Sequence, residues 1–296
     1  MSNFKNLKSK FTTNSLIIGG IIGVFCVLFA LTLLLSLFST VVVQLSNTPC
    51  IALQNTNVLN ENLALYFKFN REEKYGENNT LICDYSGNNN HGHVYGTKWY
   101  SNAGVNNTGA YVFNEMYDLI QIKDSPLLSP STHNGQLTVS FYVKFTNTKF
   151  NGKEKNYINY IGKGSSENGY EWTFRQYNES NSENRNNRLS FYTFNKTGGL
   201  GAGSYVQENI TTNEWTYITG VINGTHIKFY KNGVLKSVNP LTEYGIKLEH
   251  TNSNLYIGNL EPRTQFNGVI DELKIYKKAL TDTEVKTAYY ATRVAK

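Results

Sequence analysis

The chain has 296 residues, of which 40% are hydrophobic, 14% aromatic and only 17% charged. These proportions exclude an intrinsically disordered protein and a coiled coil, since both carry more charge and fewer aromatic residues. The formal net charge is +6, but residues 1–43 hold three lysines and no acid, so the rest carries 25 basic minus 22 acidic residues, or +3. So small a positive charge, spread over the domain, is too little for the concentrated basic stripe that binds a phosphate backbone. We therefore expect no nucleic acid as a partner.

The chain begins with a short basic segment, residues 1–15, followed by an apolar segment, residues 16–43. The apolar segment holds 28 residues without a charge, Asn, Gln or Pro, which exceeds the roughly 20 residues of a transmembrane helix. A cleavable signal peptide is the alternative, but its apolar stretch is only about 7 to 15 residues. The next basic residue is Lys68, so positive-inside bias places residues 1–15 in the cytoplasm and the rest outside. We expect a single-pass signal anchor that displays an extracellular domain on a cell or virion surface.

Residues 44–62 are polar and lack helical or strand periodicity, which is typical of a stem, and the folded domain is expected over residues 63–296. Beyond the span the cysteines are Cys50 and Cys83, an even pair that an oxidising exterior favours as a disulfide. A free buried thiol and an interchain bond from Cys50 are the alternatives. Six Asn-x-Ser/Thr triplets are glycosylation acceptors in a host that has the enzymes. They begin at Asn78, Asn106, Asn178, Asn195, Asn209 and Asn223.

The domain breaks into short runs rich in Tyr, Phe, Val, Ile and Thr, separated by Asn, Gly and Ser, which predicts many strands and two packed antiparallel sheets. In residues 137–145 apolar and polar side chains alternate, which predicts one face in the core and one in water. Residues 178–188 and 195–204 are Asn-rich and Gly-rich and are expected to be loops. The expected strands are 63–69, 110–113, 119–122, 137–145, 157–161, 170–176, 189–194, 215–222, 227–230, 255–257 and 269–276.

Two local signals concern chain reversals and ends. Asn232 and Gly233 stand between apolar runs, and Asn-Gly is the strongest short hairpin signal because both positions tolerate positive φ. Thr281 stands three residues before Glu284, which is the spacing of a capping box. We therefore expect a hairpin at 232–233 and a short helix at the C-terminus.

In order and spacing, these runs resemble the laminin-G-like or concanavalin A-like jelly-roll domain family from about residue 63 to residue 290. The resemblance implies an all-β, antiparallel two-sheet jelly-roll sandwich. The family often has Trp where Tyr142 stands and Asp where Asn114 stands. The motifs that carry the resemblance are Asp84–Gly92 (DYSGNNNHG), Gly109–Phe113 (GAYVF), Leu137–Lys144 (LTVSFYVK), Asn213–Trp215 (NEW), Phe229–Gly233 (FYKNG), Gly268–Tyr276 (GVIDELKIY) and Ala279–Glu284 (ALTDTE).

The 84–90 stretch is the candidate metal site, because it places oxygen-bearing side chains at alternate positions. These side chains are Asp84, Ser86, Asn88 and Asn90. Calcium takes 6 to 8 oxygen ligands, and the resemblance implies a structural Ca²⁺ here with Asp271 as a second carboxylate. The alternative is an Asx-turn loop whose side chains cap their own backbone. Two histidines nearby, His91 and His93, fall short of the three or four protein ligands of a zinc site.

Catalysis is not expected from this sequence. Glycosidases need two carboxylates, about 5 Å apart in retaining enzymes, and on a strand such a pair lies at i and i+2 or i+4. The chain has no Glu-x-Asp-x-x-Glu motif, and the adjacent Asp271 and Glu272 point to opposite faces of their strand. A Gly-x-Ser-x-Gly nucleophile elbow is also lacking.

Members of the family bind sugars, bind proteins or serve as structural modules, so the fold alone does not choose among them. The stretches 177–188 and 196–205 exceed the length of a simple connection and are the candidate rim of a binding site. Solvated insertion is the alternative for both. We expect a recognition or adhesion module that binds glycans, with no ligand-binding residue assigned. A protein-binding or architectural surface domain is the alternative, and a divergent glycoside hydrolase is a third.

Overall fold

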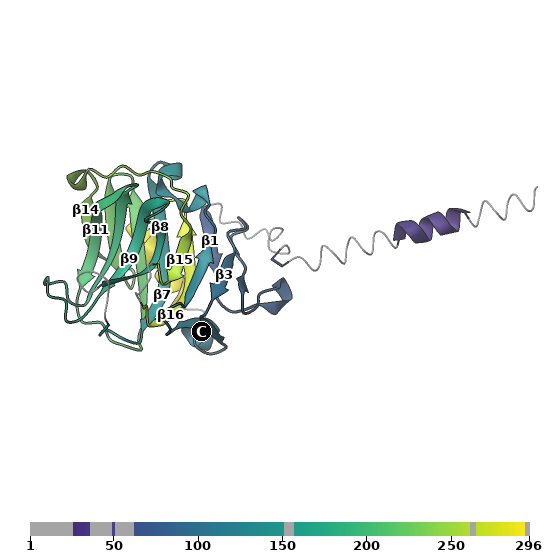
Figure 1. Ribbon diagram of the computed structural model, residues 1–296, viewed down its shortest axis with the longest axis horizontal. Helices are drawn as coiled ribbons and strands as arrows, with labels where there is room; N and C mark the ends of the chain where they lie inside the picture. Colours follow the sequence, from purple (N-terminus) through teal and green to yellow (C-terminus); the bar gives the residue numbers. More distant parts are fainter. Residues whose placement is uncertain (1–25, 36–48, 51–61, 151–156, 261–264, 294–296) are drawn as a thin grey trace, which may run out of the picture. The chain divides into compact units, whose positions relative to one another are not determined.

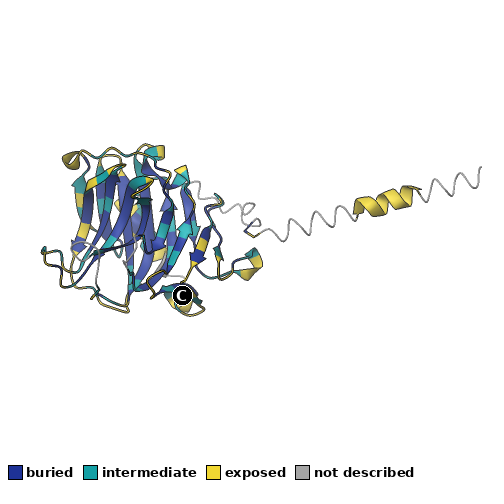
Figure 2. Ribbon diagram, viewed as in Figure 1, coloured by how far each residue is buried: buried dark blue, intermediate teal, exposed yellow. Residues whose placement is uncertain are grey.

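The computed structural model describes residues 26–35, 49–50, 62–150, 157–260 and 265–293 (Figure 1). The chain divides into two compact units, Met1–Ile51 and Ala52–Lys296. In the first unit residues 26–35 form a helix whose residues are all exposed (Figure 2). None of the helices in these ranges is both long and apolar enough to cross a membrane. Residues 1–15, the other residues of the expected 16–43 span and nearly all of the expected 44–62 stem lie outside the described ranges.

The second unit is a β-sandwich, and among its described residues each of the two antiparallel sheets holds eight strands. In order across the first sheet, called sheet A, these are β14 (Val234–Pro240), β13 (His226–Lys231), β12 (Trp215–Asn223), β7 (Gln136–Phe145), β16 (Gly268–Tyr276), β5 (Ala110–Phe113) and β4 (Lys98–Tyr100), with β1 (Leu63–Phe67) also paired to β16. Sheet B runs β11 (Gly198–Gln207), β10 (Arg188–Asn195), β9 (Gly169–Tyr177), β8 (Tyr157–Ser165), β15 (Leu255–Gly258), β6 (Leu119–Ile122), β3 (Gly92–Tyr95) and β2 (Leu81–Ile82).

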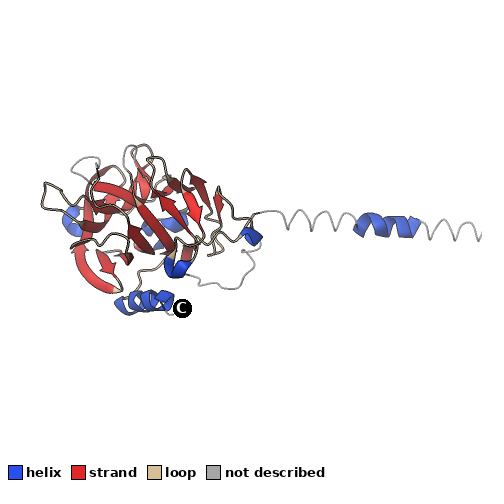
Figure 3. Ribbon diagram, turned by 90° about the horizontal axis from the view of Figure 1, so that it is seen from below, coloured by secondary structure: helices blue, strands red, loops and turns tan. Residues whose placement is uncertain are grey.

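Short helices connect the strands, and one α-helix ends the domain. The 3-10 turns are η2 (Glu73–Tyr75), η3 (Val105–Asn107), η4 (Pro126–Leu128), η5 (Pro130–His133) and η6 (Thr242–Tyr244), and the terminal helix is α2 (Asp282–Arg293). Figure 3 shows α2 on the outside of the strands. The expectation of an all-β two-sheet sandwich with a short C-terminal helix is confirmed.

One continuous hydrophobic core fills the space between the sheets. Alternate residues of each strand point inward, so Phe141 of β7 meets Phe174 of β9 edge to face, with ring centroids 5.0 Å apart. Phe174 in turn stacks on Phe191 of β10 at 4.4 Å. Burial of each such side chain stabilises the fold by about 1.5–3 kcal/mol. Figure 2 shows how much of the strands is buried, in dark blue.

The structure corrects the expectation that one face of β7 is wet, because both faces are buried. At Thr138 the outer face of β7 is covered by the chain that leads into α2. The hydroxyl group of Thr138 donates to the carbonyl of Lys278 at 2.6 Å and accepts from the N–H of Leu280 at 2.9 Å. A central strand is therefore covered on its polar face by a C-terminal segment that strand periodicity does not reveal.

The structure also corrects the expected loop at 195–204. Residues Gly198–Gln207 form the edge strand β11, which pairs with β10. The glycines of β11 have a packing role, because a Cβ atom at Gly203 would lie 2.2 Å from the ring of Tyr192, and one at Gly201 would lie 2.5 Å from the ring of Phe194. Both rings therefore lie over glycine backbone.

Three other expectations concern local elements. Asn232 and Gly233 have φ values of 52° and 75° and join β13 to β14, so the hairpin is confirmed. The capping box is confirmed as well, since the N–H of Thr281 donates to Glu284 Oε2 at 2.8 Å and the N–H of Glu284 donates to Thr281 Oγ1 at 3.2 Å. Among the described cysteines, Cys50 and Cys83 are disulfide-bonded and Cys26 is free.

Candidate functional site

The residues expected to bind calcium at 84–90 form a hydrogen-bonded loop beside β1. The Asp84 carboxylate accepts from the N–H groups of Tyr66, Ser86 and Asn90 at 2.9–3.0 Å, and the Ser86 hydroxyl lies 2.8 Å from Asp84 Oδ2. The side-chain nitrogens of Asn88 and Asn90 donate to the carbonyls of Leu63 and Ala64, each at 2.8 Å. Because a carbonyl only accepts, these two side chains must present nitrogen, and not oxygen, toward β1.

Asp271 makes its hydrogen bonds with a different turn. Its Oδ2 accepts from the N–H of Val105 at 2.8 Å, and its Oδ1 accepts from the N–H of Glu272 at 2.9 Å. Burial raises the pKa of Asp271 to about 8. In the described ranges no three His, Cys, Asp or Glu side chains gather as a metal site. The Asp84 carboxylate and the Asn88 and Asn90 amides of the loop at 84–90 thus hydrogen-bond within the protein, and the bond from the Ser86 N–H to Asp84 is that of the Asx-turn alternative.

The expected glycosylation sites differ in exposure. Asn78, Asn106, Asn209 and Asn223 are exposed, and Asn195 is half-buried. Asn178 is buried, and its side chain donates to the carbonyl of Phe150. The folded domain therefore does not present Asn178 to a glycosylating enzyme.

The outer face of sheet B carries a group of side chains that we call the arginine–aromatic cluster, namely Tyr157, Arg175, Tyr192 and Phe194. The Arg175 guanidinium lies over all three rings, with its carbon 4.4 Å from the centroid of Tyr157, 4.7 Å from Tyr192 and 5.1 Å from Phe194. The ring faces attract the cation through their negative quadrupoles. Strand periodicity explains the grouping, since the neighbours Phe174 and Phe191 point into the core.

A pocket of about 310 Å³ lies beside this cluster. It is lined by Asn159, Lys163, Gly164, Ser165, Ser166, Glu167, Tyr170, Glu171, Trp172, Thr173, Arg175, Phe194 and Leu260. The lining mixes aromatic residues with amide, hydroxyl and charged groups, which is the composition of a site that orients a small polar ligand. Asn159 is fixed within it, because its Oδ1 accepts from Arg175 Nε at 2.8 Å.

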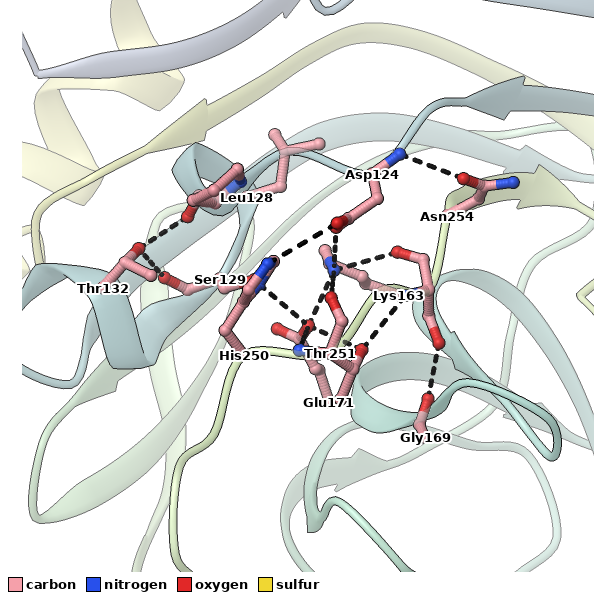
Figure 4. Close-up of polar contacts among 12 residues, drawn as sticks. Asp124, Leu128, Ser129, Thr132, Lys163, Gly169, Glu171, His250, Thr251 and Asn254 are labelled. Atoms are coloured by element: carbon pink, nitrogen blue, oxygen red, sulfur yellow. Dashed lines mark hydrogen bonds and ion pairs between the residues drawn. The ribbon is translucent and has the colours of Figure 1, made fainter.

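A buried lysine network closes one end of the pocket, and Figure 4 shows its contacts. The Lys163 ammonium lies 2.7 Å from Glu171 Oε1 and 2.7 Å from Asp124 Oδ1, and its side chain has no exposed surface. It also donates to the carbonyls of Ser253 at 2.9 Å and Thr251 at 3.2 Å. Two carboxylates and two carbonyls thus compensate the desolvated cation.

His250 joins this network from its solvent side. Its Nδ1 lies 2.9 Å from the hydroxyl of Ser129, and its Nε2 lies 3.5 Å from Asp124 Oδ2. Glu171 has a second oxygen, Oε2, that is buried and has no hydrogen-bond partner among the described residues. Glu171 lines the pocket, and this oxygen is enclosed by the protein, since the side chain is only 1% exposed.

Sequence reasoning did not identify the lining of this pocket, because none of its residues belongs to the expected rim stretches. The expected rim stretches 177–188 and 196–205 flank the cluster, the first as the loop after β9 and the second as β11. Two signals could have revealed the lining. The first signal is the presence of charged residues inside strand patterns, namely Lys163 between two glycines and Glu171 eight residues later. The second is Arg175, which lies in a stretch where polar and aromatic residues alternate. A charge in a strand interior needs a partner or a ligand.

Comparisons with known proteins agree with the fold. Residues 113–286 match the family described as the concanavalin A-like lectin/glucanases superfamily. No curated protein matches the chain. Solved structures similar to it include the receptor binding domain of botulinum neurotoxin C/D mosaic serotype (TM-score 0.61, 16% identity, 80% of this chain and 52% of that one) and the binding domain of Paraclostridial Mosquitocidal Protein 1 (0.59, 17%, 78% and 52%).

A third similar structure is the botulinum neurotoxin serotype D ligand binding domain in complex with N-acetylneuraminic acid (TM-score 0.58, 16% identity, 80% of this chain and 52% of that one). The chain spans about half the length of these structures. At such identities the likeness shows a shared fold alone.

Proposed function

Because the chain belongs to the concanavalin A-like lectin/glucanase superfamily, we propose that its domain is a non-catalytic recognition module that binds carbohydrate in the pocket on sheet B. The observation that carries the proposal is the pocket of about 310 Å³, whose lining combines Tyr170 and Phe194 with polar side chains. Sugar rings stack their C–H faces on aromatic side chains, while their hydroxyl groups need donors and acceptors close by.

The pocket supplies such partners in fixed positions. Asn159 is held by Arg175 at 2.8 Å, and Ser165, which also lines the pocket, accepts from the N–H of Asn168 at 3.0 Å. A structure similar to this chain, the botulinum neurotoxin serotype D ligand binding domain, is in complex with N-acetylneuraminic acid, and this supports a sugar ligand.

Hydrolysis is not part of the proposal, because two acidic groups of the site are paired with a lysine. Asp124 and Glu171 share the Lys163 ammonium at 2.7 Å each, so neither is placed as a free acid or nucleophile. Ser129, His250 and Asp124 form a chain that resembles a nucleophile, base and acid, yet Ser129 is fully buried. A substrate carbonyl cannot reach its hydroxyl group.

We also propose that residues 16–43 anchor the module in a membrane, with the domain outside the cell. The support is the uncharged length of that segment and the lysines before it. The test is extraction of membranes with alkaline carbonate, followed by protease treatment of intact cells. The proposal requires the full chain to stay in the membrane pellet and its domain to be cleaved from outside. Release by carbonate, or protection from the protease, would contradict it.

The sugar proposal is tested by applying the full chain, in detergent solution, to an array of neutral and acidic glycans. Tyr170→Ala removes a ring of the pocket, whereas Tyr95→Ala removes an exposed tyrosine of β3 that does not line it. We expect binding to a defined set of glycans that is lost in Tyr170→Ala and kept in Tyr95→Ala. The absence of binding by the unaltered chain would overturn the proposal and favour a protein-binding or architectural role.

A further inference from the structure

The pocket has two chemically different ends, both supplied by β9. Glu171, Thr173 and Arg175 alternate with the core residues Trp172 and Phe174 and therefore share the outer face of the strand. At about 3.3 Å per residue, Glu171 and Arg175 are about 13 Å apart along the strand. That length exceeds one sugar ring, so a ligand that fills the pocket contacts an anionic end and a cationic end.

At the Glu171 end the negative charge of the carboxylates is paired with a cation of the protein. Lys163 pairs with Glu171 and with Asp124 at 2.7 Å each, and His250 lies against the same two carboxylates. This end therefore has its cation already paired, and its two carboxylates disfavour a further carboxylate.

At the Arg175 end the charge is not compensated. Its contacts are the three rings of the cluster, the Asn159 side chain and Tyr177. In the described ranges no ion pair joins Arg175 to an Asp or Glu. Glu167 also lines the pocket but is exposed to solvent. A half-buried guanidinium without an anion is an open partner for a carboxylate, which it binds through two parallel N–H groups.

We propose that the ligand is an acidic oligosaccharide, whose carboxylate binds Arg175 while a neutral, hydroxyl-bearing sugar lies toward Glu171. The proposal rests on the proposed function and adds the charge and the orientation of the sugar. The aromatic rings hold the guanidinium in place, so little side-chain freedom is lost when the anion binds. Free monosaccharide acids would occupy only one end of the pocket.

The experiment compares each acidic glycan with its own methyl ester, which keeps the shape and removes the charge. The full chain in detergent is titrated with oligosaccharides that end in a uronic acid or a sialic acid, and with the esters. We expect the acid to bind at least about tenfold tighter than the ester at low salt. The preference should narrow as NaCl screens the charge.

Two arginine variants locate the effect. Arg175→Gln should bring the affinity for the acid down to that for the ester, and Arg175→Lys should keep part of the preference because it keeps the charge. Arg188→Gln is the control, since Arg188 also lies over a ring, 3.9 Å from the centroid of Tyr205, but does not line the pocket. It should change affinity less than about twofold. Thermal unfolding of each variant checks that it folds.

The outcomes separate this inference from the function on which it rests. Equal affinity for acid and ester overturns the acidic ligand and leaves carbohydrate binding intact. A similar loss in Arg175→Gln and Arg188→Gln indicates general charge attraction and also overturns it. If no glycan binds in any form, both proposals fail.

Discussion

Lys163 stands out at the residue scale because a fully buried ammonium lies among oxygens of four residues. Two of them, on Asp124 and Glu171, carry charge at 2.7 Å. In a low-dielectric interior each of these charges is costly without the others. Lys163 therefore fixes the β8–β9 strand pair to the segment around Thr251, and it holds Glu171 in place at the end of the pocket.

Removal of this cation should strongly destabilise the domain. Lys163→Met leaves the buried Glu171 carboxylate and the partly exposed Asp124 carboxylate without their partner, and we expect the free energy of unfolding to fall by about 3–5 kcal/mol. The double variant Lys163→Met/Glu171→Leu removes one of the stranded charges, so it should recover part of the loss. Urea unfolding followed by tryptophan fluorescence measures both. A loss below about 1 kcal/mol in Lys163→Met would show that the network does not stabilise the fold.

At the element scale, the C-terminal helix α2 depends on its capping box. Hydrogen bonds from Lys278 and Thr281 hold the pKa of Glu284 at about 2. A carboxyl whose pKa is lower in the folded state stabilises the fold above its unfolded pKa, near 4.5, and loses that effect as the pH falls toward 2. The side chain is 40% exposed, so solvent screening limits its contribution to at most about 1 kcal/mol.

The corresponding variants are Thr281→Ala and Glu284→Gln. We expect each to lower the free energy of unfolding at pH 6 by about 0.5–1 kcal/mol. The effect of Glu284→Gln should shrink as the pH is lowered to 2.5, because the carboxylate of the unaltered protein is then partly protonated. Glu243→Gln, at an exposed glutamate of η6, is the control. An effect of Glu284→Gln that grows toward low pH would contradict this interpretation of the cap.

The elements with local signals are the ones that sequence reasoning located. Strands β5 and β6 coincide with the expected ranges, and the Asn-Gly hairpin and the capping box are as expected, because each depends on residues close in the sequence. The wet face assigned to β7 was wrong because the covering segment at 277–280 lies more than 130 residues away. Strand β11 was missed because its glycines pack under rings of the neighbouring strand, a contact with no signature in β11 itself.

At the scale of the whole molecule, the two sheets meet along the edge formed by β14 and β11. They are joined there by side-chain hydrogen bonds and not by a backbone hydrogen-bond ladder. Ser237 of β14 hydrogen-bonds Ser204 and Tyr205 of β11. This contact closes the sandwich next to the hairpin that carries Tyr192 and Phe194. The site was not predictable residue by residue, since Lys163, Arg175 and Phe194 meet only when β8, β9 and β10 pair.

Removal of calcium should not affect the stability of this domain. The Asp84 carboxylate is partnered by N–H groups of the protein, and Asn88 and Asn90 direct nitrogen toward β1. We therefore expect the thermal midpoint to differ by less than about 1 °C between buffer with calcium and buffer with EDTA, where a bound ion would raise it by mass action. A calcium-dependent rise of several degrees would restore the sequence-based expectation of a structural Ca²⁺.

The central claim is that the domain binds a sugar in the pocket on sheet B that Arg175 lines. The most direct measurement is calorimetric titration of the full chain with the strongest glycan from the array, using the unaltered protein, Tyr170→Ala and Tyr95→Ala. The account requires one ligand per chain, an affinity reduced at least about tenfold in Tyr170→Ala, and no change in Tyr95→Ala. Equal affinity in all three proteins would place the sugar elsewhere and contradict the assignment of this pocket.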